Sequence, residues 1–180
     1  MFSSPLLYRN LPNFRAGVFS LTKTTLTFGE DTRISSNCTG RDYQSNNRKC
    51  LKGADAIEVS GGIIRTGKLS PSRPGITTRE KEAYFREYTQ KMKAAISIPL
   101  ILVGGIKSFE VASEIIEQEV ADYISMSRAF VREPDLIHRW KNGDLGPAQC
   151  KSDNLCFTPG FEGKGVYCVT REIEEKKNCV

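Results

Sequence analysis

Two short segments carry the residue types best suited to chemistry. Gly104-Gly105 follows the apolar run 98–103, and Ser127-Arg128 follows the predicted strand 121–126. Glycine lets backbone amides approach a ligand closely because no Cβ intervenes, and the start of a following helix adds partial positive charge. We interpret Gly104, Gly105, Ser127 and Arg128 as two walls of a phosphate cradle. In the plainer alternative, the glycine pair only turns the chain after a strand.

The elements that must position this cradle alternate between strand and helix patterns. Strands are predicted over residues 54–60, 98–103 and 121–126, and the second reads as a continuous apolar run, which is typical of buried parallel strands. Helices are predicted over residues 78–95, from the N-cap Ser108 onward, and from a first turn at Pro134 to Gly143. On the first of these helices, Phe85, Tyr88 and Met92 fall on one face.

Strand starts lie about 30 to 45 residues apart, a spacing that predicts parallel βα units. The 180 residues are fewer than the roughly 200 that a whole (β/α)8 barrel needs. We therefore predict an α/β fold, the C-terminal part of a (β/α)8 TIM barrel with about three βα units. Three strands would leave two open sheet edges, so we also expect self-association.

The chain divides into three parts. Residues 1–52 show no sustained periodicity and are predicted to be a poorly ordered arm, residues 53–142 hold the partial barrel, and residues 143–180 form an irregular tail with four cysteines. A polar run over 171–177 is compatible with a short solvated helix. Seven basic and three acidic residues in positions 1–50 account for +4 of the net charge of +5.

Composition excludes several classes of protein. No basic cluster with interleaved aromatic residues suggests a nucleic-acid partner, and no apolar run approaches the roughly 18 residues of a membrane span. The six cysteines are not dense, and no signal-peptide core opens the chain. We therefore expect free thiols and a cytoplasmic location, although the acid-free residues 1–29 also fit an organelle-import segment.

Three motifs together give a family resemblance: DAIEVSGG at 55–62, IPLILVGGIKS at 98–108 and ADYISMSRAFVREPDL at 121–136. They resemble the last three strands of the old yellow enzyme family, the NADH:flavin oxidoreductases. The resemblance implies a (β/α)8 barrel, a non-covalent FMN cofactor whose phosphate is held at Gly104, Gly105, Ser127 and Arg128, and NAD(P)H as electron donor. Ser127 stands where many relatives have glycine, but its amide can still donate.

The family's catalytic parts find no match in this sequence, so no catalytic residue is assigned. The single histidine, His138, falls on the last predicted helix and is expected to be solvated. Three hypotheses remain. The first is a truncated oxidoreductase that passes hydride from NAD(P)H, through flavin, to an activated double bond or other small-molecule acceptor. The second is an inactive half-barrel that binds FMN or phosphate, and the third is a non-functional fragment.

The cysteine tail is similar to the cluster-binding tail of some relatives. Cys150, Cys156 and Cys168 fit a C-x2-C-x2-C-x11-C frame, but the second position is Asp153. A carboxylate is a poor substitute for a thiolate in iron–sulfur chemistry, whereas zinc accepts it. We predict a site without metal, with a three-cysteine cluster or a zinc site as the alternatives.

Overall fold

The computed structural model describes the backbone of residues 25–28 and all of residues 55–61 and 70–179. Its centre is a parallel sheet in the order β1-β2-β3-β4, with strands at Thr25–Phe28, Ile57–Gly61, Leu100–Leu102 and Tyr123–Ile124. Strand β1 pairs with β2 in parallel register, Thr25 opposite Glu58. The described sheet therefore has one more strand than the sequence predicted, and that strand lies in the segment expected to be a poorly ordered arm.

The face of the sheet covered by helices is formed by alternate strand residues. Ile57 pairs with Leu100, and Val59 pairs with Leu102. All four side chains are fully buried. The continuous apolar pattern 98–103 thus marked a buried strand correctly, although only Leu100–Leu102 is regular.

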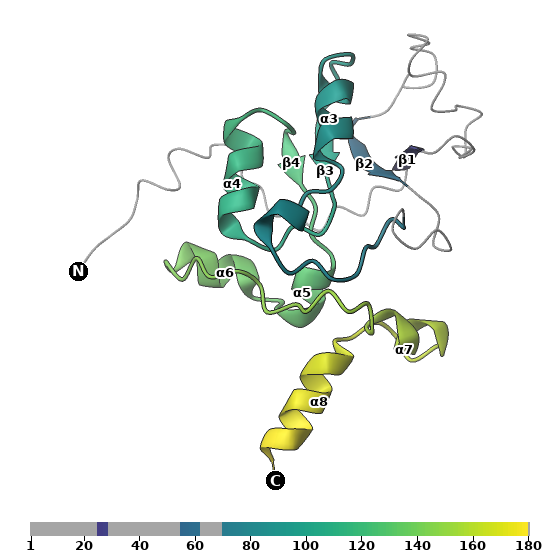
Figure 1. Ribbon diagram of the computed structural model, residues 1–180, viewed down its shortest axis with the longest axis vertical. Coiled ribbons are helices and arrows are strands. Elements are labelled where there is room, and N and C mark those ends of the chain that lie inside the picture. The colour runs from purple at the N-terminus through teal and green to yellow at the C-terminus, as the bar shows by residue number, and fades with distance from the viewer. Residues whose placement is uncertain (1–24, 29–54, 62–69, 180) are drawn as a thin grey trace.

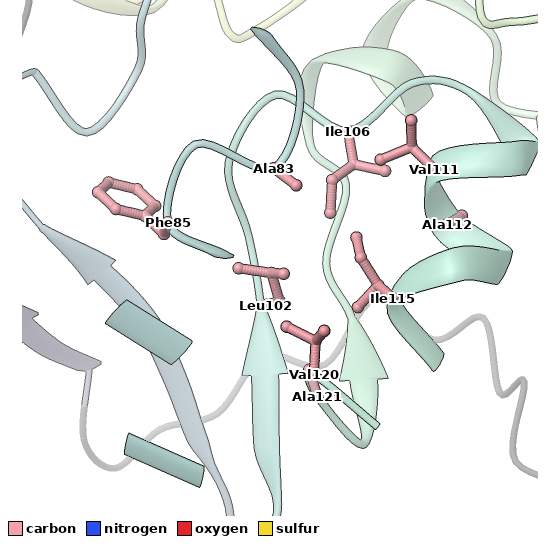
Figure 2. Close-up of a cluster of buried hydrophobic side chains, with 9 residues drawn as sticks. All are labelled: Ala83, Phe85, Leu102, Ile106, Val111, Ala112, Ile115, Val120 and Ala121. Atoms are coloured by element: carbon pink, nitrogen blue, oxygen red, sulfur yellow. The ribbon is translucent and has the colours of Figure 1, made fainter. Parts of the chain in front are cut away.

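Helix α3 (Arg86–Lys93) packs on β3, and α4 (Phe109–Glu117) lies beside β4 (Figure 1). The main core forms where α4 and the chain before α3 meet the sheet, and Figure 2 shows its side chains converging. The buried members are Ala83, Phe85, Leu102, Ile106, Val111, Ala112, Ile115, Val120 and Ala121. This core fixes the carboxyl ends of β3 and β4 in place.

The helix predicted over 78–95 is interrupted. The structure has a short 3-10 helix, η3 (Arg79–Lys81), and then α3 from Arg86. Between them Ala83 adopts φ +50°, and the Tyr84 amide donates to the Gly104 carbonyl at 3.2 Å. The prediction of a shared apolar face was correct for Phe85 and Met92 but wrong for Tyr88, which is exposed.

Ser108 begins α4 as predicted, but its hydroxyl does not cap the helix. The buried carboxylate of Glu82 does so instead. It accepts hydrogen bonds from the Lys107 amide at 2.8 Å, the Ser108 amide at 2.9 Å and the Ser108 hydroxyl at 2.5 Å. A carboxylate at this position satisfies orphan amides and the partial positive charge of the helix start. Because the chain is not helical between η3 and α3, Glu82 can reach the start of α4.

Two short helices follow β4: α5 (Arg128–Arg132) and α6 (Leu136–Lys141). Pro134 lies between them, ahead of the N-cap Asp135, and not in the first helical turn as predicted. Gly143, with φ +95°, ends α6 as expected. A second core joins α5 and α6 through Ala129, Leu136, Trp140 and Ala148.

The tail is more regular than the sequence suggested. It contains α7 (Phe157–Phe161) and α8 (Val169–Asn178), and α8 extends away from the sheet (Figure 1). Helix α8 has no buried residue and carries ion pairs four residues apart, Arg171–Glu175 and Lys176–Glu172. The predicted solvated helix over 171–177 is thus present. His138 is exposed, as expected. Within the described ranges, every helix is too short or too polar to cross a bilayer.

Candidate functional site

A pocket of about 430 Å³ opens where β3 and β4 end. Three of the four predicted cradle residues line it, namely Gly105, Ser127 and Arg128. The two loops that the sequence paired are therefore brought together. The pocket wall also includes Lys107 from the β3 side and apolar side chains such as Met126. No described lining residue is acidic, so Lys107 and Arg128 give the pocket a net positive charge.

Gly104, the fourth predicted cradle residue, lies against the Tyr84 segment. It is buried and does not line the pocket. A Cβ on Gly104 would come within 3.1 Å of the Tyr84 amide nitrogen, and its φ of +141° suits glycine. At Gly105, with φ +72°, a Cβ would lie 2.9 Å from the Tyr84 ring. The glycine pair thus permits close packing on the Tyr84 segment, while Gly105 alone reaches the pocket.

Four backbone amides are available at this point. No hydrogen bond between described residues uses the amides of Gly105, Ile106, Ser127 or Arg128 as donors. The next two amides along the first loop, those of Lys107 and Ser108, are taken by Glu82. These four amides and the two cations are therefore groups that an anion in the pocket could contact.

Both cations are held by uncharged acceptors. Arg128 Nη1 donates to Asn154 Oδ1 at 2.6 Å, and Lys107 Nζ donates to the Cys150 carbonyl at 3.4 Å. Neither cation forms an ion pair with a described carboxylate. A guanidinium has five donors, and Asn154 occupies one of them. The remaining donors and the charge are available to an anion.

Tyr84 closes one side of the pocket. Its hydroxyl donates to the Pro71 carbonyl at 2.8 Å and accepts from the Arg73 amide at 3.4 Å. The Arg73 guanidinium stacks over the Tyr84 ring, 4.4 Å from its centroid. Tyr84 falls within the helix predicted over 78–95, but it lies outside any helix because α3 begins only at Arg86. Since its hydroxyl is already bonded within the 70–73 loop, Tyr84 positions that loop.

Sequence reasoning missed three contributors to the pocket: Lys107, Tyr84 and Asn154. Lys107 stands two residues after the glycine pair, and a basic residue so close to a predicted phosphate loop was a usable signal. Asn154 gave no such signal, because its contact with Arg128 joins residues 26 positions apart.

The cysteines of the tail do not assemble a metal site in this structure. Cys150, Cys156, Cys168 and Cys179 are free, and no group of three or more potential ligands comes together within residues 55–61 and 70–179. Asp153 instead accepts hydrogen bonds from the Leu155 amide and the Thr170 hydroxyl. The Cys168 sulfur lies 3.9 Å from Arg132 Nη1. Cys38 and Cys50 lie outside the described residues.

We expect Cys156 to react slowly with alkylating reagents. Burial raises the pKa of its thiol, and the nearby Cys150 raises the pKa further. Because only the thiolate attacks, alkylation by iodoacetamide at pH 8 should be about tenfold slower at Cys156 than at the exposed Cys179. Peptide mapping by mass spectrometry at timed intervals measures both rates in one sample. Equal rates at the two cysteines would contradict the buried placement of Cys156.

Comparisons with known proteins find a family match and several relatives. The model of the NADH:flavin oxidoreductase / NADH oxidase family matches residues 63–145. A bilirubin reductase of Mediterraneibacter gnavus is 32% identical over 92 residues, which are 51% of this chain and 14% of that protein. An NADH oxidase of Thermoanaerobacter brockii is 28% identical over 127 residues, which are 67% of this chain and 18% of that protein.

A solved structure, described as a 2-naphthoyl-CoA reductase in complex with 2-naphthoyl-CoA, superimposes with a TM-score of 0.52 at 17% identity. The match covers 69% of this chain and 18% of that one, and it supports the fold alone. Together, the family match and the relatives show that residues 63–145 of this chain are similar to the NADH:flavin oxidoreductase / NADH oxidase family. The matched part of the chain spans less than a fifth of each of these three relatives.

Proposed function

We propose that this chain holds the phosphate end of FMN, as part of an oxidoreductase site that takes electrons from NAD(P)H. The observation that carries the proposal is the pocket in which Gly105, Ser127, Arg128 and Lys107 converge without an acidic residue. Free amides and uncompensated cations fit a phosphate monoester dianion. When FMN is bound, its ring supplies the hydride chemistry, and the chain's own residues bind and orient it.

Several finer properties belong to the same proposal. The electron acceptor would be a small molecule, such as one with an activated double bond. The pocket's apolar wall, including Met126, Phe157 and Phe161, suits a flat aromatic ring beside the phosphate. We further propose a partial (β/α)8 barrel that self-associates through the outer edges of β1 and β4. The four described free cysteines favour a cytoplasmic location.

The proposal predicts that the chain prefers FMN to riboflavin. Hydrogen bonds to charged groups contribute about 1.5–3 kcal/mol each, so losing the phosphate should weaken binding by roughly tenfold or more. Riboflavin has the same ring and lacks only the phosphate. Quenching of flavin fluorescence, titrated with the full 180-residue chain, measures both dissociation constants. Equal dissociation constants for the two flavins would rule out the phosphate site.

Salt provides an internal control for this experiment. If Lys107 and Arg128 contact the phosphate, the preference for FMN should shrink as ionic strength rises, because partly exposed charges are screened. Binding of riboflavin should change little over the same range. A preference for FMN that is insensitive to salt would assign the selectivity to a different contact.

A further inference from the structure

The tail contributes a short loop to the pocket, residues 150–154, which we call the tail loop. It supplies the acceptors for both cations of the site: the Cys150 carbonyl for Lys107 and the Asn154 side chain for Arg128. The tail loop lies beyond the segment that matches the family model, which ends at residue 145. Its contribution to the pocket therefore follows from this structure and not from the family match.

Asn154 is the most connected residue of the tail loop. Its Oδ1 accepts from Arg128 Nη1 at 2.6 Å and from Ser72 Oγ at 3.2 Å, and its Nδ2 donates to the Ser72 carbonyl at 2.9 Å. Its backbone has φ +66°, a left-handed conformation that asparagine tolerates better than most residues. One side chain thus joins the guanidinium, the 70–73 loop and the tail.

A second contact holds the tail loop in the same place. The Ser152 carbonyl accepts a hydrogen bond from the Gly75 amide at 2.9 Å. Ser152 is buried and also left-handed, with φ +55°. Two non-glycine residues within three positions share this costly conformation. The hydrogen bond between Gly75 and Ser152 thus anchors the tail loop independently of the contact between Asn154 and Arg128.

We infer that Asn154 is a positioning residue for anion binding: it orients Arg128 toward the pocket without neutralising it. A carboxylate at the same place would hold the guanidinium equally well, but it would cancel the charge that the ligand needs. The amide oxygen of Asn154 holds the Arg128 guanidinium in place and leaves its positive charge available to the ligand. This inference rests on the proposed phosphate site and adds the tail loop to it.

The test compares Asn154→Asp and Asn154→Gly with wild type, using FMN and riboflavin as probes on the full chain. Aspartate keeps the shape and the acceptor but pairs with Arg128, and glycine keeps the left-handed backbone but removes the anchor. Each variant should bind FMN about tenfold more weakly than wild type and bind riboflavin with unchanged affinity. Asp153→Asn is the matched control, since Asp153 bonds within the tail and does not line the pocket.

The ratio of the two affinities separates positioning from a structural role. A merely structural defect weakens both flavins alike and leaves the ratio at its wild-type value, which would overturn the inference. Should Asn154→Asp fail to fold, Asn154→Gly decides the question. In an Arg128→Gln background, Asn154→Gly should have no further effect on FMN, because Asn154 acts through Arg128. An equal, additive loss in that background would also overturn it.

The experiment distinguishes failure of this inference from failure of the proposed function. If wild type binds FMN and riboflavin equally, the phosphate site itself is wrong. If wild type prefers FMN and both Asn154 variants keep that preference in full, the phosphate site stands and the role of Asn154 is refuted. Loss of preference in the Asp153→Asn control would likewise refute a specific role for Asn154.

Discussion

Replacing Ser127 by aspartate is expected to abolish the preference for FMN over riboflavin. The Ser127 side chain is exposed at the pocket and makes no capping bond, so a carboxylate is accommodated there without repacking. It would stand beside the phosphate dianion. At an effective dielectric of about 20, like charges about 4 Å apart repel by roughly 4 kcal/mol, and salt screening reduces this to about 2–4 kcal/mol, or roughly 30- to 1,000-fold.

Ser127→Asn is the matched control, because it has nearly the same shape as aspartate without the charge. The asparagine variant should bind FMN within about threefold of wild type, since a neutral exposed substitution usually costs less than about 0.5 kcal/mol. Riboflavin affinity should be similar for all three proteins. If Ser127→Asp still binds FMN as tightly as wild type, the phosphate does not lie beside this loop.

Replacing Leu102 by alanine is expected to give the largest loss of stability. Leu102 is fully buried at the centre of the main core, where β3 meets α4 and the Phe85 ring (Figure 2). Removing a buried leucine side chain costs transfer free energy and leaves a cavity, together about 2–5 kcal/mol. Urea unfolding followed by circular dichroism should show a lower urea midpoint, from which the loss in the free energy of unfolding is calculated.

Leu155→Ala makes the same chemical change at an exposed position of the tail, where 43% of the residue is accessible. It should shift the free energy of unfolding by less than about 0.5 kcal/mol. Comparable losses for the two variants would show that β3 is not the centre of the folded core. A flavin titration of Leu102→Ala should also show weakened binding, because β3 carries the Gly105 loop into the pocket.

The parts of this molecule that sequence reasoning predicted are those encoded locally. Strand patterns in the sequence placed β2, β3 and β4, and the glycine pair and Ser127-Arg128 placed two loops at the ends of neighbouring parallel strands. Since parallel strands end at the same edge of a sheet, those loops had to meet. The pocket at that edge contains three of the four predicted residues.

The parts that sequence reasoning missed depend on contacts distant along the chain. The helix predicted over 78–95 breaks because Glu82 reaches α4 and the Tyr84 amide bonds to Gly104, about 20 or more residues away. Local propensity favours a continuous helix there, and tertiary contacts override it. Asn154 meets Ser72 across 82 residues. No local pattern encodes such a pair.

Amide chemical shifts report directly on whether these four amides and two cations form a phosphate site. In a ¹⁵N-labelled sample titrated with FMN, the amides of Gly105, Ile106, Ser127 and Arg128 should shift strongly. The amides of Lys107 and Ser108 should shift little, because Glu82 already binds them. Riboflavin should leave the first four nearly unmoved. Shifts of equal size with both flavins, or shifts absent from these four amides, would contradict the site.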